Sequence, residues 1–407
     1  MTDRTGAPLD ARALLRGTSD TAKDINRRKI IRSVMISPRT QVGIAKDTRL
    51  SPATVSTAVA ELQQEGVFRV ETGEGERGKR VHLGDVRGVA VGIEVDHSRV
   101  TIGVRRLDAV ALEYETADFG PDQPVALRFR EAARLAKDLV ARIGMSNDLI
   151  VSVGVGIPAA VDPRTARLTQ VSSSLGWDVG GDLRLFLYDE FPDTPVIVDN
   201  EANLAAYGEY VYGAGRNHET MLYVKASTGI GAGLVVRGLI FRGRHGIAGE
   251  IGHLTMEAEG RVCRCGNRGC LETVAGGARI LEQVRQAYSG YRLDLPTTLD
   301  RVVERAKSGD PVCRRVLEDA ARTIGLALAT VCTLWDPETV VVGGELGGAA
   351  DLLLDVLRES MRRHTVPGVF RVENEPTTVV ASELGAGAGA RGALAFGLEV
   401  EASARKK

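Results

Sequence analysis

The stretch Gly249–Glu272, GEIGHLTMEAEGRVCRCGNRGCLE, is the most informative part of this 407-residue sequence. It holds one histidine and three of the five cysteines, at positions His253, Cys263, Cys265 and Cys270. Three thiolates and one imidazole are the ligand set of a closed tetrahedral zinc site. Gly266 and Gly269 allow the tight turns that bring closely spaced thiols onto one ion. We therefore predict a structural zinc site formed by these four side chains.

The cysteine cluster has two alternatives to a metal site. The thiols could simply lie reduced in a turn, although four soft ligands rarely cluster by chance. A disulfide is disfavoured because the sequence shows no secretory signal, and a reducing compartment keeps thiols reduced. Glu250 and Glu272 flank the same segment, where a metal would hold them rigidly enough to recognise a polyhydroxylated ligand. Both are equally compatible with a solvated surface position.

Composition predicts a multidomain protein with a substantial core. The chain is long enough for two or three domains, and 43% of its residues are hydrophobic while 26% are charged. A net charge of −1 predicts no bulk attraction to nucleic acid or membrane, so any basic surface must be local. No transmembrane run or secretory signal is apparent, and we expect a cytoplasmic protein. Cys313 and Cys332 lie in apolar helical patterns and are expected in the core.

The N-terminal region has the pattern of a winged helix-turn-helix. Residues 1–20 show no periodicity and are expected to form a flexible arm. Residues 21–84 then show three short helical patterns, of which the last two are separated by a tight turn, followed by two alternating apolar stretches joined by a glycine-rich hairpin. This region has 12 Lys and Arg against 7 Asp and Glu, a net charge of +5. Such local charge is typical of DNA binding.

The second helix of the helix-turn-helix begins with the strong start signal Ser51-Pro52. Small polar side chains near its N-terminus suit close entry into the major groove. Lys79 and Arg80 at the wing could reach phosphates or the minor groove. We therefore predict DNA contacts from Ser51, Ala53, Thr54, Ser56, Thr57, Lys79 and Arg80. The alternative is a winged helix that contacts protein.

From Gly88 onward, strand and helix patterns alternate, which indicates an α/β architecture. An opening strand hairpin appears twice, once after Gly88 and again after Asn217. We expect a strand running into a Gly/Pro loop at LIVSVGVGIPAAVD, and a strand, turn and helix at PVIVDNEANLAAYGEYVYGAG. This doubled plan indicates two related lobes.

The motifs GEIGH and C-x-C-G-x-x-G-C-x-E resemble the signature of the ROK family of repressors and sugar kinases, and further matches extend over nearly the whole chain. The resemblance implies a two-lobed α/β actin-like ATPase (sugar-kinase-like) fold behind the α+β winged helix. We expect lobe 1 at residues 88–210 and lobe 2, with the zinc site, at 211–407. The N-terminal layout is similar to the DNA-binding module of ROK repressors.

Two elements that the family's kinases use for phosphoryl transfer are altered here. The first phosphate loop, D-x-G-G-T-K in the kinases, corresponds to residues 94–99, where Asp96 replaces a glycine that lets the main chain approach an anion. The catalytic carboxylate of the N-D-A-N motif corresponds to Glu201, one methylene longer. We therefore expect no efficient catalysis. Residual nucleotide binding could involve Thr228, Gly229, Gly231, Gly343 and Gly344.

The sugar side of the family's site is better preserved. By resemblance, a monosaccharide would be bound by Gly156, Asn200, Glu201, Glu250, His253 and Glu272. Carboxylates accept hydrogen bonds and amides both donate and accept, as polyol recognition requires. The alternative for Asn203, and less so for Asn200, is that it caps the following helix.

The sequence thus predicts a ROK transcriptional regulator, most simply a repressor of carbohydrate-utilisation genes. It would bind operator DNA as a homodimer or homotetramer and sense a monosaccharide or its derivative. Two alternatives stay open. One is an active sugar kinase with a DNA-binding appendage, and the other is a regulator controlled by a phosphotransfer protein.

Overall fold

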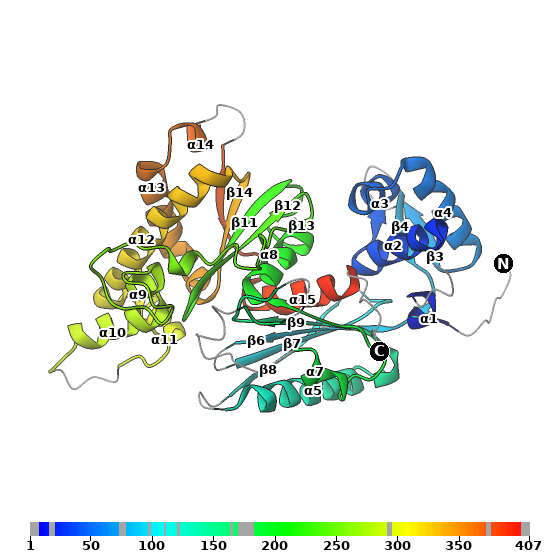
Figure 1. Cartoon of the computed structure of the whole chain (residues 1–407), viewed down its shortest axis with the longest axis horizontal. Coiled ribbons are helices and arrows are strands. Elements are labelled where there is room, and N and C mark those ends of the chain that lie inside the picture. The colour runs from blue at the N-terminus through cyan, green and yellow to red at the C-terminus, as the bar shows by residue number, and fades with distance from the viewer. Residues whose placement is uncertain are drawn as a thin grey trace. The chain divides into compact units, whose positions relative to one another are not determined.

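The structure is a computed structural model that describes residues 8–15, 21–72, 79–96, 99–109, 111–119, 123–162, 165, 167–169, 183–290, 295–371 and 376–399. The chain divides into two compact units (Figure 1). The first unit comprises residues 1–155, 184–198 and 393–407, and the second comprises residues 156–183 and 199–392. The lobe boundary expected at about residue 210 therefore falls inside the second unit. No helix of the described residues is long and apolar enough to span a membrane.

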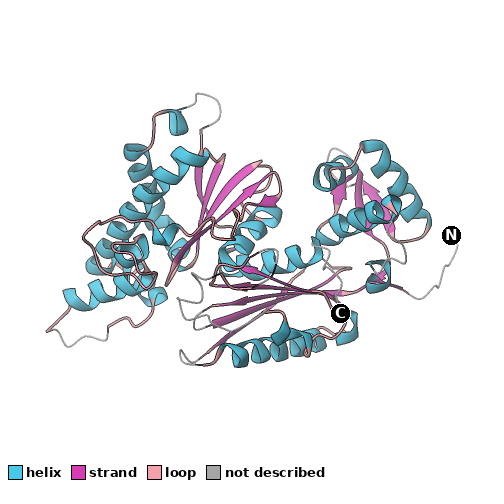
Figure 2. Cartoon of the chain, in the orientation of Figure 1, coloured by secondary structure: helices cyan, strands magenta, loops and turns pink. Residues whose placement is uncertain are grey.

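The winged helix-turn-helix lies in the first unit, with the expected helices and an additional short strand (Figures 1 and 2). Side chains at the three N-caps accept backbone N–H bonds and so fix the helix starts. A three-stranded sheet of order β2-β4-β3 forms the wing. The elements are α2 Ala22–Ile36, β2 Arg39–Thr40, α3 Gln41–Thr48, α4 Pro52–Gln64, β3 Phe68–Thr72 and β4 Lys79–Leu83.

Part of the segment expected as a flexible arm has regular structure. Strand β1 (Leu9–Asp10) pairs in parallel with β5 (Val86–Arg87), and helix α1 (Ala11–Leu15) follows it. The side chain of Ala11 is fully buried. The sequence pattern missed this segment because two strand residues and five helical residues are too short to show a period.

A five-stranded sheet of order β10-β9-β6-β7-β8 belongs mainly to the first unit. The hairpin β6–β7 pairs from Val89↔Arg106 to Val95↔Val100. Helix α15 comes so close to β9 that a Cβ on Gly154 would lie 1.8 Å from the carbonyl oxygen of Ala393. The remaining elements are β6 Val89–Val95, β7 Arg99–Arg106, β8 Glu113–Asp118, α5 Val125–Arg142, η1 Asn147–Leu149, β9 Ile150–Ile157, α7 Leu185–Tyr188, β10 Val196–Asn200 and α15 Ala388–Glu399.

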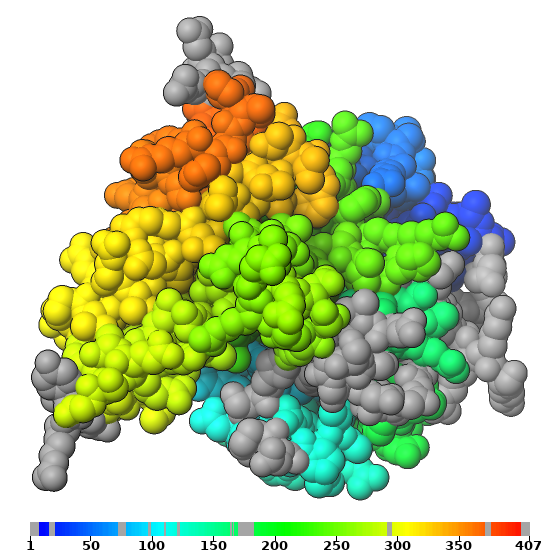
Figure 3. All heavy atoms as spheres, turned by 60° about the vertical axis from the view of Figure 1, so that its left-hand side comes forward, coloured from blue at the N-terminus to red at the C-terminus, as the bar shows by residue number. Residues whose placement is uncertain are grey.

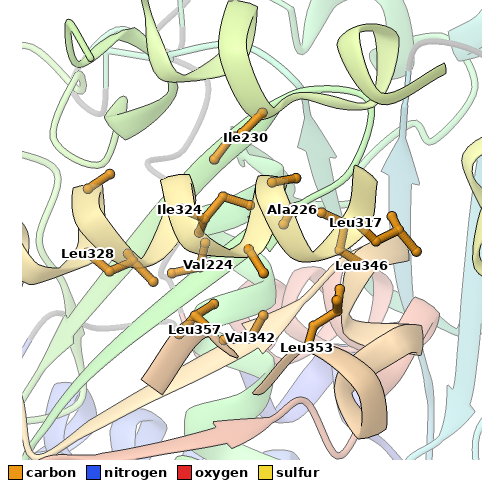
Figure 4. Packing of buried hydrophobic residues seen from close by; sticks show 14 of the residues in the cluster. Val224, Ala226, Ile230, Leu317, Ile324, Leu328, Val342, Leu346, Leu353 and Leu357 are labelled. Carbon is orange, nitrogen blue, oxygen red and sulfur yellow. The ribbon is translucent and has the colours of Figure 1, made fainter. Parts of the chain in front are cut away.

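The second unit is built on a sheet of order β13-β12-β11-β14-β15, in which β11 pairs with β12 antiparallel and with β14 in parallel. Val224 and Val342 of this sheet pack against helices α12 and α13 in a continuous apolar core (Figure 4). Helix α8 packs close to β12, since a Cβ on Gly233 would lie 2.5 Å from the carbonyl oxygen of Ala202. The strands are β11 Thr220–Ala226, β12 Ile230–Val236, β13 Leu239–Ile240, β14 Thr339–Gly343 and β15 Thr378–Ala381.

Helices surround this sheet, and several of them form the outer surface of the unit in Figure 3 (yellow-green to orange). Successive side chains of β11 point to opposite faces of the sheet, and one face packs on the helices. Val224 and Ala226 are in the helical core, whereas Lys225 between them is not part of it. The helices are α8 Glu201–Tyr212, η2 Ile251–His253, α9 Leu271–Ala275, α10 Gly277–Ala287, α11 Leu299–Lys307, α12 Pro311–Trp335, η3 Glu345–Ala349, α13 Ala350–His364, α14 Gly368–Arg371 and η4 Gly385–Gly387.

Candidate functional site

The four predicted metal ligands lie together. His253 comes from η2, and the three cysteines come from the following loop and its junction with α9. One ligand atom from each residue lies within 4.8 Å of all the others. Cys263 Sγ is 3.6 Å from His253 Nδ1, and Cys265 Sγ is 3.7 Å from Cys270 Sγ. Tetrahedral zinc with ordinary bond lengths would give about 3.6 Å between nitrogen and sulfur and about 3.8 Å between two sulfurs, so these residues fit zinc.

Glycines shape the loop that carries the thiols. Gly266 has φ +91° and Gly269 has φ +61°, both in the left-handed region that favours glycine. A Cβ on Gly269 would also lie 1.6 Å from the carbonyl oxygen of Glu257. Two isolated antiparallel β-bridges hold the loop closed; one pairs Thr255 with Cys270 and the other pairs Val262 with Arg268. The sequence thus folds into a turn that presents its thiols to one point.

His253 links this cluster to the neighbouring carboxylates. Its Nδ1 faces Cys263, while its Nε2 lies 3.8 Å from Glu250 Oε2. Burial lowers the pKa of His253, although the Glu272 carboxylate opposes this, and so favours the neutral ring that binds metals. A carboxylate near the second nitrogen is a common orienting contact for a ligating histidine.

The thiols respond to burial in different ways. Burial raises the pKa of Cys270 to about 12 and also raises the pKa of Cys263. Burial acts in the same direction on Cys265, but hydrogen bonds from the Asn267 backbone and neighbouring thiols leave its pKa lowered. Since a metal binds thiolates, occupation of this site would release protons.

The two flanking glutamates are partly buried in the second unit, with the side chains of Glu250 and Glu272 28% and 17% exposed. Burial raises the pKa of Glu250, and the nearby Glu272 carboxylate adds to the effect. Glu272 Oε1 lies 3.1 Å from Arg264 Nη2, which is on the loop between Cys263 and Cys265. Its Oε2 accepts a hydrogen bond of 3.4 Å from the backbone N–H of Ile230. Glu272 therefore connects the metal loop with the β11–β12 turn.

Asn200 and Glu201 lie where β10 leads into α8. Asn200 Oδ1 caps α8, accepting from the N–H groups of Ala202 at 2.8 Å and Asn203 at 3.2 Å. The capping alternative therefore holds for Asn200 and not for Asn203. Asn203 Nδ2 instead donates to Asp199 Oδ1. The position Asn200 fits the cap because its extended backbone directs the side chain back to the helix N–H groups.

The Glu201 carboxylate is paired with Lys225, a residue that sequence reasoning missed. Lys225 Nζ lies 2.7 Å from Glu201 Oε2, and the two side chains are only 10% and 12% exposed. Nearby, Arg242 donates to Asp199, with Nε 2.7 Å from Oδ2. A lysine inside the otherwise apolar strand pattern of β11 was the available signal, since buried lysines are rarely unpaired. A Cβ on Gly156 would lie 3.3 Å from Glu201 Cα, so Gly156 borders the same place.

The predicted nucleotide residues come together at the β11–β12 turn and at the end of β14. The backbone N–H of Glu345, just after Gly343 and Gly344, donates to Ser227 Oγ at 3.2 Å. A Cβ on Gly229 would lie 2.8 Å from Glu272 Oε2. Gly344 has φ +74°. Packing within the chain therefore accounts for glycine at these positions without a nucleotide.

The six residues expected to bind sugar thus form two groups in the second unit. Gly156, Asn200 and Glu201 make one, and Glu250, His253 and Glu272 make the other. The β11–β12 hairpin contacts both, through Lys225 on one side and Ile230 on the other. The first phosphate loop lies in the first unit, where the Asp96 N–H donates to the carbonyl of Arg99, and residues 97–98 fall outside the described residues.

The predicted DNA contacts lie at the start of α4 and on β4. Ser51, Ala53, Ser56 and Thr57 are exposed and Thr54 is half-buried, while the apolar side of the helix is buried through Val55, Val59 and Leu62. Ser51 Oγ caps the helix by accepting from the Thr54 N–H at 3.1 Å. Lys79 is exposed and Arg80 is half-buried on β4, and residues 73–78 at the wing tip lie outside the described residues.

Residues 129–399 match the family model described as "ROK family", and the chain belongs to that family. It is 29% identical over 372 residues to the xylose repressor of Caldicellulosiruptor bescii, covering 87% of this chain and 91% of the relative. It is 29% identical over 323 residues to the glucokinase of Streptomyces coelicolor, covering 75% of this chain and 96% of the enzyme. A crystal structure of a ROK family transcriptional regulator, a homolog of the E. coli MLC protein, matches with a TM-score of 0.73 and 22% identity over 93% of this chain and 97% of the other. These findings confirm the expected family and fold.

Proposed function

We propose that this protein is a DNA-binding transcriptional regulator, most simply a repressor of carbohydrate-utilisation genes, that senses a monosaccharide or its derivative. The observation that carries the proposal is the winged helix-turn-helix with small polar side chains exposed on α4. The similarity to a xylose repressor extends over 87% of the chain, whereas the similarity to a glucokinase extends over 75%. The additional length in the repressor match supports a regulator.

The sensing site would use the two groups of polar residues on the second unit. Glu250, His253 and Glu272 would accept or donate hydrogen bonds to sugar hydroxyls, together with Glu201 and the wall at Gly156. Asn200 has its Oδ1 committed to the α8 cap, so its contribution to a sugar would come through the Nδ2 group, which now donates to Ala159.

Phosphoryl transfer is not part of the proposed function. A catalytic base needs a carboxylate able to take a proton, but Lys225 holds the Glu201 carboxylate in a buried ion pair. The first phosphate loop has Asp96 where the kinases have glycine, which adds a like charge near a phosphate. Two separate features therefore oppose catalysis.

Zinc bound by His253, Cys263, Cys265 and Cys270 would act as a structural ion. It would fix the loop that presents Glu272 and Arg264 and would hold His253 beside Glu250. No step of the sensing mechanism passes through the metal.

Sensing would work through two states of the protein that bind operator DNA with different affinities. A homodimer or homotetramer would read two half-sites about one helical turn apart, or a multiple of that. A bound sugar would favour the state in which the paired α4 helices no longer match this spacing.

A thermal-shift panel of monosaccharides and their phosphates, with and without MgATP, tests the proposal. A ligand at about 100 times its dissociation constant stabilises the bound state by about 2.7 kcal/mol. A shift with one sugar that MgATP does not change supports the sensor. ADP formation from a hexose and MgATP would support the kinase alternative, and the absence of any sugar shift would favour a phosphotransfer protein as the controlling partner.

A further inference from the structure

The buried side chain of Arg105 joins the DNA-binding module to the sheet of the first unit. Arg105 lies near the end of β7 and is only 6% exposed. Its Nη1 donates to the carbonyl oxygen of Ile36 at 2.6 Å, and its Nη2 donates to the carbonyl of Met35. These carbonyls belong to the last two residues of α2. Arg105 thus binds the C-terminal end of the helix that supports the helix-turn-helix.

This contact satisfies a specific electrostatic need. The last carbonyls of a helix have no partner within the helix and carry its partial negative charge. Helix α2 has no basic residue in its last turn. Ser37 follows the helix in an extended conformation, and its backbone N–H donates to the carbonyl of Ser33, one turn before the helix end. Among the described residues, Arg105 has no carboxylate within ion-pair distance. The helix terminus is therefore the group that compensates the buried guanidinium.

The same module is attached to the first unit at a second point. The β1–β5 pairing joins the segment before α2 to the segment after β4. Arg12 of α1 donates to the carbonyl oxygens of Asp148 at 2.7 Å and Asp193 at 2.9 Å. The segments on either side of the module are thus held to the sheet body, and Arg105 holds its first helix.

Strand β7 connects the Arg105 contact with the opposite end of the β6–β7 hairpin. It runs from Arg99, whose Nε donates to Asp118 at 2.9 Å, to Arg105 near its other end. Six residue steps of a strand span about 20 Å. At this end of the hairpin the Asp96 N–H donates to the carbonyl of Arg99 at 2.8 Å, in the part of the sequence that corresponds to the first phosphate loop of the family's kinases. A displacement of β7 along its length would therefore move the end of α2.

We propose that Arg105 is a positioning residue that fixes the DNA-binding module on the sensor and transmits the sensor's state to it. The proposal rests on the proposed regulator function. Arg105 then sets both the operator affinity and the response of that affinity to a sugar, although its side chain is buried and is not among the residues proposed to contact DNA or sugar. The β1–β5 pairing and the hydrogen bonds of Arg12 limit how far the module moves when the Arg105 contact is lost.

Substitutions at Arg105 test the inference. The variants are Arg105→Ala, Arg105→Lys, which retains a cation that can reach a carbonyl, and the control Arg106→Ala, whose exposed side chain pairs with Asp108. Hydrogen exchange of the residue 34–37 amides is measured in the full-length protein. Loss of two charge-assisted bonds should speed this exchange by about tenfold or more in Arg105→Ala, with partial rescue in Arg105→Lys and no change in Arg106→Ala.

The same three variants are then compared in binding to genomic fragments selected by the wild-type protein. The probes are D-xylose, D-glucose and N-acetylglucosamine at millimolar concentration. Arg105→Ala should bind DNA more weakly and lose the sugar-dependent change in affinity, whereas Arg106→Ala should behave as wild type. If Arg105→Ala does not fold, the exchange and binding data of Arg105→Lys decide the outcome.

Wild-type exchange at residues 34–37 in Arg105→Ala, or a full sugar response in a variant whose exchange has increased, would overturn the proposal. If the wild-type protein itself selects no DNA, the regulator function is wrong, while the exchange data still show whether Arg105 holds α2. The two failures are therefore distinguishable.

Discussion

Breaking the buried Lys225–Glu201 pair should strongly destabilise the second unit. The charged atoms are 2.7 Å apart, and both side chains are about nine-tenths buried. At an effective dielectric constant of about 20, Coulomb attraction at this distance is about 6 kcal/mol, which is partly offset by the dehydration of both charges. Lys225→Met would leave the Glu201 carboxylate buried without this cation. We expect a loss of about 3–5 kcal/mol in the free energy of unfolding.

A double-mutant cycle with Lys225→Met, Glu201→Gln and the double variant measures this effect in urea unfolding followed by circular dichroism. The double variant should lose less than the sum of the single variants, with a coupling energy of up to about 3 kcal/mol. Arg301→Met is the matched control, because Arg301 pairs with Glu304 at 3.1 Å but both are more than 60% exposed. The control should change stability by less than about 1 kcal/mol.

Additive single effects, or a loss in Lys225→Met no larger than in the control, would refute this reasoning. Such a result would mean that water or other groups compensate Glu201 in the folded state. It would also weaken the argument that Glu201 is unsuited to act as a base.

Two further predictions concern the metal site and α4. Alkylation at pH 8 should modify Cys265 after chelation and none of the five cysteines before it, because Cys265 is partly exposed and its hydrogen bonds outweigh burial and lower its pKa, whereas the other four thiols are buried and burial raises their pKa. Mass spectrometry locates the adduct, and alkylation of Cys265 without a chelator would contradict a metal site. Ser51→Ala should lower winged-helix stability by about 1 kcal/mol through loss of the α4 cap, whereas Ser56→Ala should leave thermal stability unchanged and weaken only DNA binding; equal stability of the two variants would argue against the cap.

Local sequence signals accounted for much of this structure. Ser51-Pro52 marked the start of α4, and the three short helical patterns expected in residues 21–84 are present as α2, α3 and α4. Short apolar runs rich in valine and isoleucine, bounded by turn residues, indicated strands of both large sheets. Ligand type and spacing were sufficient to group His253, Cys263, Cys265 and Cys270, since a short loop leaves few arrangements for three nearby thiols.

Contacts between distant residues were not predictable in this way. Arg105 and Ile36 are 69 positions apart, and Lys225 and Glu201 come from a strand and a helix with no shared local pattern. The role of Asn200 as a cap depended on where β10 ended, a boundary that alternation alone does not define. A lobe boundary near residue 210 would assign most of α8 to lobe 1, whereas α8 packs on the sheet of the second unit.

The central claim is that a sugar changes the affinity of this protein for specific DNA. The most direct measurement selects genomic fragments on the full-length protein and then follows binding of the recovered fragment by fluorescence anisotropy across the monosaccharide panel, at fixed salt because phosphate contacts depend on ionic strength. The account predicts recovery of a defined sequence and a change in affinity of about fivefold or more with one sugar, without ATP. Recovery of random fragments, or an affinity that no sugar changes, would contradict it.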